Sequence, residues 1–239
     1  MRKIAALLVA CSLLSACTVV PGSVAQGGAS RSNAATGNGT VMVARAPAMT
    51  QRPVAVSPDQ RQCLSELNQA GAQFTPVVDN YFGNGCSTVG TVQLAALSGD
   101  GGNMSIGNIG PVQCGVGSAL AAWARFGVDR AARQLLGSPL QRIETFGSYS
   151  CRNVAGSQRR SAHATAGAID ISAFVMADGR RITVAGDWQS GSAAEKEFLR
   201  TVQRSACRRF DTVLGPEYNA AHHDHLHLEG VIEGNSFCR

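Results

Sequence analysis

The sequence predicts an α+β domain in which a small antiparallel sheet is flanked by helices. Two helix starts carry capping residues, at Ser57 and at Ser192, and each is followed by apolar residues in helical spacing. Short apolar or alternating stretches lie between and after these helices, as is typical of strands. With 239 residues, of which 44% are hydrophobic and 15% charged, the chain suits one globular domain with accessory segments.

The first residues are typical of an export signal. Met1-Arg2-Lys3 precedes an apolar run from Ile4 to Leu14, which is too short for a stable membrane anchor. Leu14-Ser15-Ala16-Cys17 resembles the bacterial lipobox, in which cleavage before the cysteine is coupled to lipid attachment on its sulfur. We therefore predict a lipoprotein signal peptide over residues 1–16 and a lipid at Cys17. An ordinary signal peptide that ends in a cysteine is the alternative.

The next segment, residues 18–56, is rich in small and polar residues and shows no apolar period. Together with Cys17 it forms a predicted tether over 17–56, whose 39 residues after the cysteine could extend to roughly 130 Å. In the lipoprotein sorting pattern, Thr18 in place of Asp indicates the outer membrane. We therefore expect a periplasmic domain, held to that membrane through Cys17.

Charge argues against a nucleic-acid partner. Once Arg2 and Lys3 are removed with the signal, 19 basic and 16 acidic side chains remain, a net charge of about +3. The basic residues are scattered along the chain instead of forming a patch.

Six cysteines remain outside the signal and the lipidation site. An even number in an exported chain predicts three disulfides, and no pair shows the Cys-x-x-Cys spacing of a zinc ribbon. Six cysteines allow 15 pairings, among which the sequence does not choose. The candidates are Cys63, Cys86, Cys114, Cys151, Cys207 and Cys238.

The folded domain is predicted to span residues 57–239. It opens with a helix in which Ser57 is the cap, Pro58 occupies the first position and Gln60 completes a capping box, and which ends at Gly71. Residues 82–111 are rich in Gly, Asn and Ser and predict strands and loops. Later helices are expected over 116–126, continuing over 128–136, and from Ser192 onward. Strands are expected over 143–146, 168–174, 181–184, 213–214 and 225–228.

All five histidines lie in two short pieces, residues 161–170 and 222–227. Six residues separate His163 from Asp170, and Gly167 between them would permit a close turn, so a loop histidine and a strand aspartate could converge on one ion. A catalytic zinc takes three protein ligands, commonly histidine nitrogen and carboxylate oxygen, and keeps a fourth position for water.

The second piece offers a further ligand and a base. On a strand, His225 and His227 project to the same face, so one can bind metal while the other faces substrate. A base must accept the proton of an activated water, and Asp224 and His225 are the candidates. Strict alternation would turn Asp224 away from His227, so Asp224 can serve only if the regular strand begins after it.

Each piece alone has an ordinary explanation. His163 could be a core or loop histidine, and the second piece could be a metal-scavenging surface loop or chance. Together the two pieces favour a mononuclear metal site.

These residues also carry a family resemblance. His163, Gly167 and Asp170 match the His-x3-Gly-x2-Asp core of the D-Ala-D-Ala carboxypeptidase group, which is related to lysostaphin-type endopeptidases and the hedgehog signalling domain. Residues 224–227 contain both forms of that group's second motif, an acidic residue three before a histidine and His-x-His. More closely, residues 63–229, about 70% of the chain, resemble the bacterial extensin-like C-terminal domain family. The matching segments are Gly147 to Arg152, Asp187-Trp188, the Cys207 helix, Leu214-Gly215-Pro216 and the final His-x-His.

The resemblance implies a fold like that of hedgehog and the D-Ala-D-Ala peptidases. It also implies that His163, Asp170 and His227 bind Zn²⁺, with Asp224 or His225 as the base. Arg152, which lies two residues away from the arginine of the carboxypeptidase pattern, would stabilise the oxyanion or a substrate carboxylate, and a buried structural arginine is the alternative.

The sequence therefore predicts a zinc-dependent hydrolase of amide bonds in peptidoglycan stem peptides, either a carboxypeptidase or an endopeptidase. A catalytically silent domain that binds wall peptides or a protein partner is the competing hypothesis, and a periplasmic zinc-binding protein is a third. The complete ligand set and the candidate bases favour the enzyme.

Overall fold

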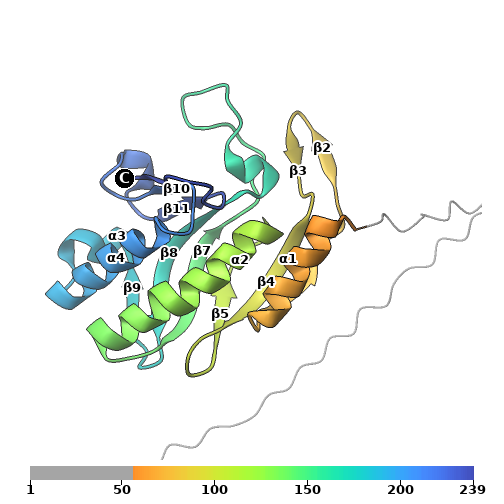
Figure 1. Cartoon of the computed structure of the whole chain (residues 1–239). Coiled ribbons are helices and arrows are strands. Elements are labelled where there is room, and N and C mark those ends of the chain that lie inside the picture. Colours follow the sequence, from red (N-terminus) through yellow and green to blue (C-terminus); the bar gives the residue numbers. More distant parts are fainter. Residues whose placement is uncertain (1–55) are drawn as a thin grey trace, which may run out of the picture. The chain divides into compact units, whose positions relative to one another are not determined.

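The computed structural model describes residues 56–239, which form an α+β domain (Figure 1). In this part of the chain four α-helices accompany a ten-stranded mixed sheet and a separate two-stranded hairpin. The predicted signal peptide, the lipidation site at Cys17 and the tether up to residue 55 lie outside the described residues.

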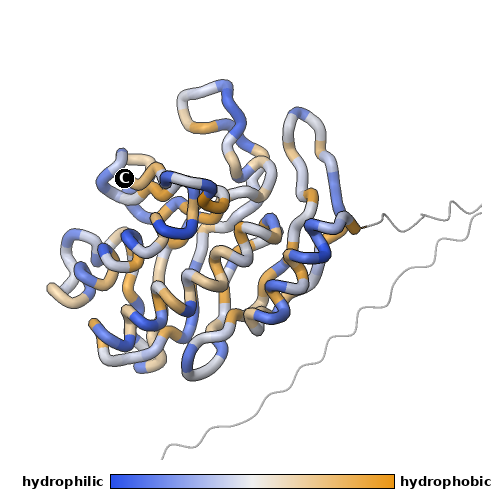
Figure 2. The backbone as a smooth tube through the Cα atoms, in the orientation of Figure 1, coloured by the Kyte–Doolittle hydropathy of each residue, from blue (hydrophilic) through white to orange (hydrophobic). Residues whose placement is uncertain are grey.

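The first helix, α1 (Pro58–Gln69), begins as predicted. The backbone N–H of Gln60 donates to the Ser57 hydroxyl at 3.1 Å, and Pro58 occupies the first turn. The helix contains this half of the predicted capping box alone, because the Gln60 side chain does not return the bond. Gly71 follows with a φ of +72° and ends the helix. Figure 2 shows apolar and polar residues alternating along α1, as a helix packed on one side requires.

The sheet is larger than predicted. Its main path runs β1-β4-β5-β7-β8-β11-β10-β12, while β6 pairs with β4 and β9 pairs with β8. The strands are β1 (Gln73–Pro76), β4 (Thr91–Ser98), β5 (Asn103–Gly107), β6 (Pro111–Gln113), β7 (Leu140–Gly147), β8 (Ala168–Met176), β9 (Arg181–Thr183), β10 (Thr212–Leu214), β11 (Leu226–Glu229) and β12 (Phe237–Cys238). The hairpin consists of β2 (Tyr81–Gly83) and β3 (Cys86–Ser87).

The prediction of a small, wholly antiparallel sheet is therefore wrong. Two pairs are parallel, β5 with β7 and β10 with β12. Between β5 and β7 the chain passes through β6 and a long helical segment, and such a crossover brings the second strand back in the same direction as the first. The expected strands and loops of residues 82–111 add several of the short strands.

The helix α2 (Cys114–Trp123) continues through two π-helical segments, Ala124–Asp129 and Ala132–Leu136, and ends at Gly137 with a φ of +69°. The predicted continuation beyond Gly127 is confirmed. A Cβ atom at Gly127 would lie 2.4 Å from the Ser205 hydroxyl, so this glycine allows a second helix to approach closely.

That second helix is α4 (Ala193–Ala206), and its predicted capping box is complete. The Glu195 N–H donates to the Ser192 hydroxyl, and the Ser192 N–H donates to the Glu195 carboxylate. The preceding helix α3 (Val184–Ser190) was not predicted, because Val184 continues the apolar pattern of β9. The Thr183 hydroxyl, which accepts from the Gly186 N–H at 3.0 Å, starts α3 and ends the strand.

The helices pack against one face of the sheet, which we call the helix face (Figure 1). Phe174 of β8 contacts Trp123 of α2 and Phe198 of α4, with ring centroids 6.0 and 5.3 Å apart. Trp123 is fully buried, as predicted for a core residue. None of the helices in residues 56–239 has the length and apolar character that a membrane span requires.

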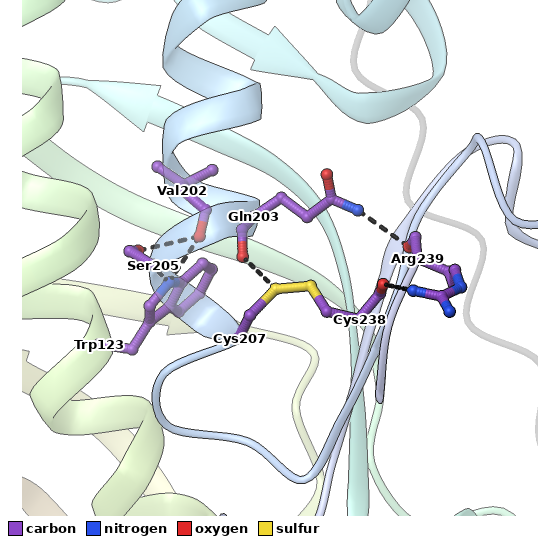
Figure 3. The surroundings of a disulfide bond; sticks show 7 residues. All are labelled: Trp123, Val202, Gln203, Ser205, Cys207, Cys238 and Arg239. Atoms are coloured by element: carbon purple, nitrogen blue, oxygen red, sulfur yellow. Dashed lines mark hydrogen bonds between the residues drawn. A yellow bond between two sulfur atoms is a disulfide. The ribbon is translucent and has the colours of Figure 1, made fainter. Parts of the chain in front are cut away.

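The three predicted disulfides are confirmed. They are Cys63–Cys114 between α1 and α2, Cys86–Cys151 between β3 and the segment after β7, and Cys207–Cys238 between the end of α4 and β12. Figure 3 shows the surroundings of the third, where the Trp123 indole donates to the Val202 carbonyl and the Ser205 hydroxyl. Disulfides persist in oxidising compartments, so the domain is adapted to conditions outside the cytoplasm.

Candidate metal centre

The candidate metal centre begins with two neighbouring strands. In the antiparallel pair β8 and β11, Asp170 lies directly opposite His227. Ile169 and Ile171, on either side of Asp170, belong to the hydrophobic core. Since successive side chains of a strand alternate between faces, Asp170 and His227 project from the opposite face, which we call the site face.

The third candidate ligand, His163, lies in a short 3-10 helix of residues 162–165 whose first turn is capped by Ser161. The chain leaves this turn through Ala166, which has a left-handed φ of +57°. The close turn that Gly167 was expected to permit is present, and the Gly167 N–H donates to the Ala162 carbonyl at 2.9 Å, but the left-handed residue of the turn is Ala166 instead of Gly167. A Cβ atom at Gly167 would come no nearer than 3.4 Å to its surroundings, so space does not require a glycine there either.

The structure brings His163, Asp170 and His227 together, all of them buried. His163 Nε2 lies 3.2 Å from His227 Nδ1 and 3.2 Å from Asp170 Oδ1, and His227 Nδ1 lies 2.9 Å from Asp170 Oδ1. In a tetrahedral zinc site with bonds of about 2.0–2.1 Å, two ligand atoms are roughly 3.3 Å apart. The three atoms therefore have nearly the spacing of three corners of such a site.

The outer hydrogen bonds of the two histidines direct their lone pairs inward. His163 Nδ1 donates to the Ser148 carbonyl at 2.5 Å, and His227 Nε2 donates to the Glu229 carboxylate at 3.1 Å. Both acceptors lack protons, so in each neutral ring the proton is on the outer nitrogen. Two imidazole lone pairs and one carboxylate then converge on the same point, where only a cation or a proton relieves their repulsion.

The pKa values of Asp170, His227 and Glu229 are shifted by the contacts among these imidazoles and carboxylates. Burial alone would raise the pKa of Asp170, but the imidazoles of His163 and His227 hold it well below its usual range. Burial alone would lower the pKa of His227, but the carboxylates of Asp170 and Glu229 outweigh burial and raise it to about 9. The contact with His227 lowers the pKa of Glu229. The centre thus stabilises positive charge despite its burial.

The two candidate bases are in contact with each other. The strand β11 begins at Leu226, so His225 lies just before the strand instead of within it as predicted. His225 Nδ1 is 2.9 Å from Asp224 Oδ1, and His225 Nε2 is 3.5 Å from Asp170 Oδ1. The structure therefore places His225 next to the centre, and Asp224 contacts the ring nitrogen of His225 that does not face the centre.

Arg152 lies at the rim of the centre. Its Nη2 is 3.7 Å from Asp170 Oδ2, and 47% of its side chain is exposed. This exposure rules out the alternative of a buried structural arginine.

Sequence reasoning missed three parts of the site: the Ser148 carbonyl, Glu229 and His222. The period of two could have identified Glu229, which follows His227 by two residues on the same strand. His222 lies in a 3-10 turn of residues 220–222, with its ring 5.1 Å from that of His225. Burial, together with the charges of His225 and His227, lowers the pKa of His222 to about 4.

The fold and the site define an α+β domain with a candidate metal centre of two histidines and one aspartate on the site face of its sheet. The chain belongs to the family described as extensin-like protein C-terminus, whose model matches residues 61–239. This match confirms the resemblance inferred from the sequence. No curated protein and no solved structure matches the chain.

Proposed function

We propose that this domain is a zinc-dependent hydrolase that cleaves amide bonds in peptidoglycan stem peptides. One observation carries the proposal: the ligand atoms of His163, Asp170 and His227 converge, and the ring nitrogen of a fourth residue, His225, lies 3.5 Å from Asp170. Two imidazoles and a carboxylate are a ligand set of catalytic zinc. A Zn²⁺ ion held by these residues would polarise the substrate carbonyl and lower the pKa of a water molecule.

We assign different roles to His225 and Asp224, according to their positions. His225 Nε2 faces the centre and accepts the proton of the attacking water, then returns it to the leaving amine. Asp224 accepts a hydrogen bond from His225 Nδ1 and so holds the ring in this tautomer and orientation. Asp224 is then a positioning residue, and His225 is the base.

Arg152 supplies positive charge at the rim. Its exposed guanidinium can donate hydrogen bonds to the carbonyl oxygen as negative charge develops on it, or to a carboxylate of the substrate. Either use requires a side chain that reaches solvent, which Arg152 has.

We further propose that the domain is a periplasmic lipoprotein, anchored to the outer membrane through Cys17. The export signal and the lipobox support the anchor, and the three disulfides support the oxidising compartment. The peptide stems of the wall lie in that compartment, which makes them the expected substrate.

The test compares two variants on purified muropeptides. His225→Ala should retain its metal while cleavage falls by at least a hundredfold, because general-base catalysis contributes about 10²–10⁴. Asp224→Asn should lose less activity and should shift the pH profile of kcat, since Asp224 acts through His225. Muropeptide binding without cleavage by the metal-loaded parent would instead favour the silent binding domain, and cleavage that survives His225→Ala would remove the assigned base.

A further inference from the structure

A groove of about 460 Å³ lies beside the metal centre on the site face of the sheet. The residues that line it come from β7, β8 and β9 and from the end of β5, and they include Asn108, Arg142, Glu144, Phe146, Ser172 and Arg181. Arg142, Glu144 and Phe146 alternate along β7 with the buried residues Ile143 and Thr145. This alternation directs the side chains of Arg142, Glu144 and Phe146 away from the core.

The groove and the centre share a wall. Ser172 follows Asp170 by two residues on β8, which corresponds to roughly 7 Å along a strand. The ring of Phe146 lies edge-on to the ring of His225, with centroids 5.9 Å apart. An extended peptide with its scissile bond at His225 would therefore enter the groove about two residues from that bond.

The charge of the groove is unbalanced. Arg142 Nη2 lies 2.7 Å from one oxygen of Glu144, and Arg181 Nη2 lies 2.7 Å from the other. One carboxylate thus faces two guanidinium groups, which leaves a net charge of about +1. These bonds use one N–H of Arg142 and two of Arg181, out of five on each side chain.

Exposure and polarity fit an incoming ligand. About half of each arginine side chain is exposed, 47% for Arg142 and 52% for Arg181. Phe146 adds an apolar wall that is 56% exposed. The Ser172 hydroxyl donates to the Glu144 carbonyl, and the Asn108 amide donates to the Thr145 carbonyl, so both groups stiffen the floor of the groove.

We propose that this groove binds a substrate segment that carries a free carboxylate, held by Arg142 and Arg181 about two residues from the cleaved bond. The proposal rests on the proposed function, and it narrows the substrate class to acidic peptides. It also means that the enzyme discriminates against stem peptides in which this carboxylate is amidated. A guanidinium pair recognises a carboxylate strongly because its hydrogen bonds are charge-assisted.

The test measures binding apart from hydrolysis. In a His225→Ala background, which prevents turnover, calorimetry compares one synthetic stem peptide with forms of it amidated at one carboxylate at a time. We expect amidation at one particular carboxylate to weaken binding about tenfold, the loss of one hydrogen bond to a charged group. The double variant Arg142→Gln/Arg181→Gln should lose this preference. Equal affinities for all the peptides in the His225→Ala protein with both groove arginines intact would overturn the proposal.

Arg204→Gln is the matched control, because Arg204 is an exposed arginine of α4 paired with Glu197 at 2.8 Å, outside the groove. It should keep the full preference. The single variant Arg181→Gln, with its fold checked by circular dichroism, replaces the double variant if that one does not fold. It should then lose most of the preference, and an unchanged preference would overturn the proposal.

Hydrolysis by the parent separates the two proposals. A carboxylate preference in binding without any hydrolysis would refute the proposed function and leave the groove assignment standing. Hydrolysis with the same KM for free and amidated peptides would refute the groove assignment and leave the function standing.

Discussion

Both faces of strand β8 are buried, but one carries apolar side chains and the other carries polar ones. Toward the helices the strand presents Ile169, Ile171 and Phe174, which join the hydrophobic core. Toward the site face it presents Asp170 and Ser172, each only 8% exposed. Buried apolar groups stabilise a fold, whereas buried polar groups cost free energy unless they are satisfied. The helix face thus stabilises the domain, and the site face uses part of that stability to hold the converging side chains of the candidate metal centre.

The largest expected effect is a loss of stability caused by a substitution on the helix face. Phe174→Ala should destabilise the domain by roughly 3–5 kcal/mol, because it removes a ring packed between Trp123 and Phe198. Ser172→Ala, two residues away on the site face, removes one hydrogen bond to the Glu144 carbonyl and should cost about 1 kcal/mol. Urea denaturation of both variants measures the difference, and equal losses would contradict the contrast between the faces.

A second change probes how closely the helices pack. Gly127→Ala should destabilise by about 1–3 kcal/mol, since its Cβ would lie 2.4 Å from the Ser205 hydroxyl. Gly117→Ala in the same helical segment is the control, with no atom nearer than 3.5 Å, and it should gain up to about 1 kcal/mol from helix propensity. Thermal unfolding compares the two. A neutral Gly127→Ala would show that α4 is not held as closely as described.

On the site face, Glu229 offers a smaller test. Glu229→Gln keeps an acceptor for His227 Nε2 but removes the charge, so metal affinity should fall about tenfold while the fold is unchanged. Glu233→Gln, at an exposed carboxylate four residues later, should leave the affinity as it is. Competition with a fluorescent zinc chelator measures both variants. Equal affinities in both would remove Glu229 from the site.

The smallest effect concerns the turn after His163. Ala166→Gly should stabilise the domain by up to about 1 kcal/mol, because a left-handed φ of +57° is strained for alanine. Gly167→Ala should be nearly neutral, given an ordinary contact of 3.4 Å. Chemical denaturation measures the stability of both variants. A loss of stability in Gly167→Ala alone would indicate that Gly167 is the residue that the turn requires.

Sequence reasoning was sufficient where a local pattern carries the information. The caps at Ser57 and Ser192 determine helix starts through bonds within one turn, and the long apolar run at Ala168 identifies a buried strand. The histidines and Asp170 were identifiable because their clustering is visible in one dimension.

Other features depend on contacts that no local pattern records. The extent of the sheet comes from strands of two to five residues, such as β6 and β12, too short to show a period. The disulfide pairing follows from the path of the whole chain. The Ser148 partner of His163 is a backbone carbonyl, so its side chain gives no signal. Ala166, whose carbonyl accepts a hydrogen bond from the distant Gln113 N–H, carries the left-handed turn, although glycine is the more typical residue for one.

The measurement that tests the central claim most directly is the metal content of the protein purified from an oxidising compartment. Mass spectrometry compares the parent, His227→Ala and, as a matched histidine control, His223→Ala, which removes a ring that is 72% exposed. We predict close to one zinc per chain in the parent and in His223→Ala, and almost none in His227→Ala. A well-folded parent without metal, or a His227→Ala variant that keeps its zinc, would contradict the account.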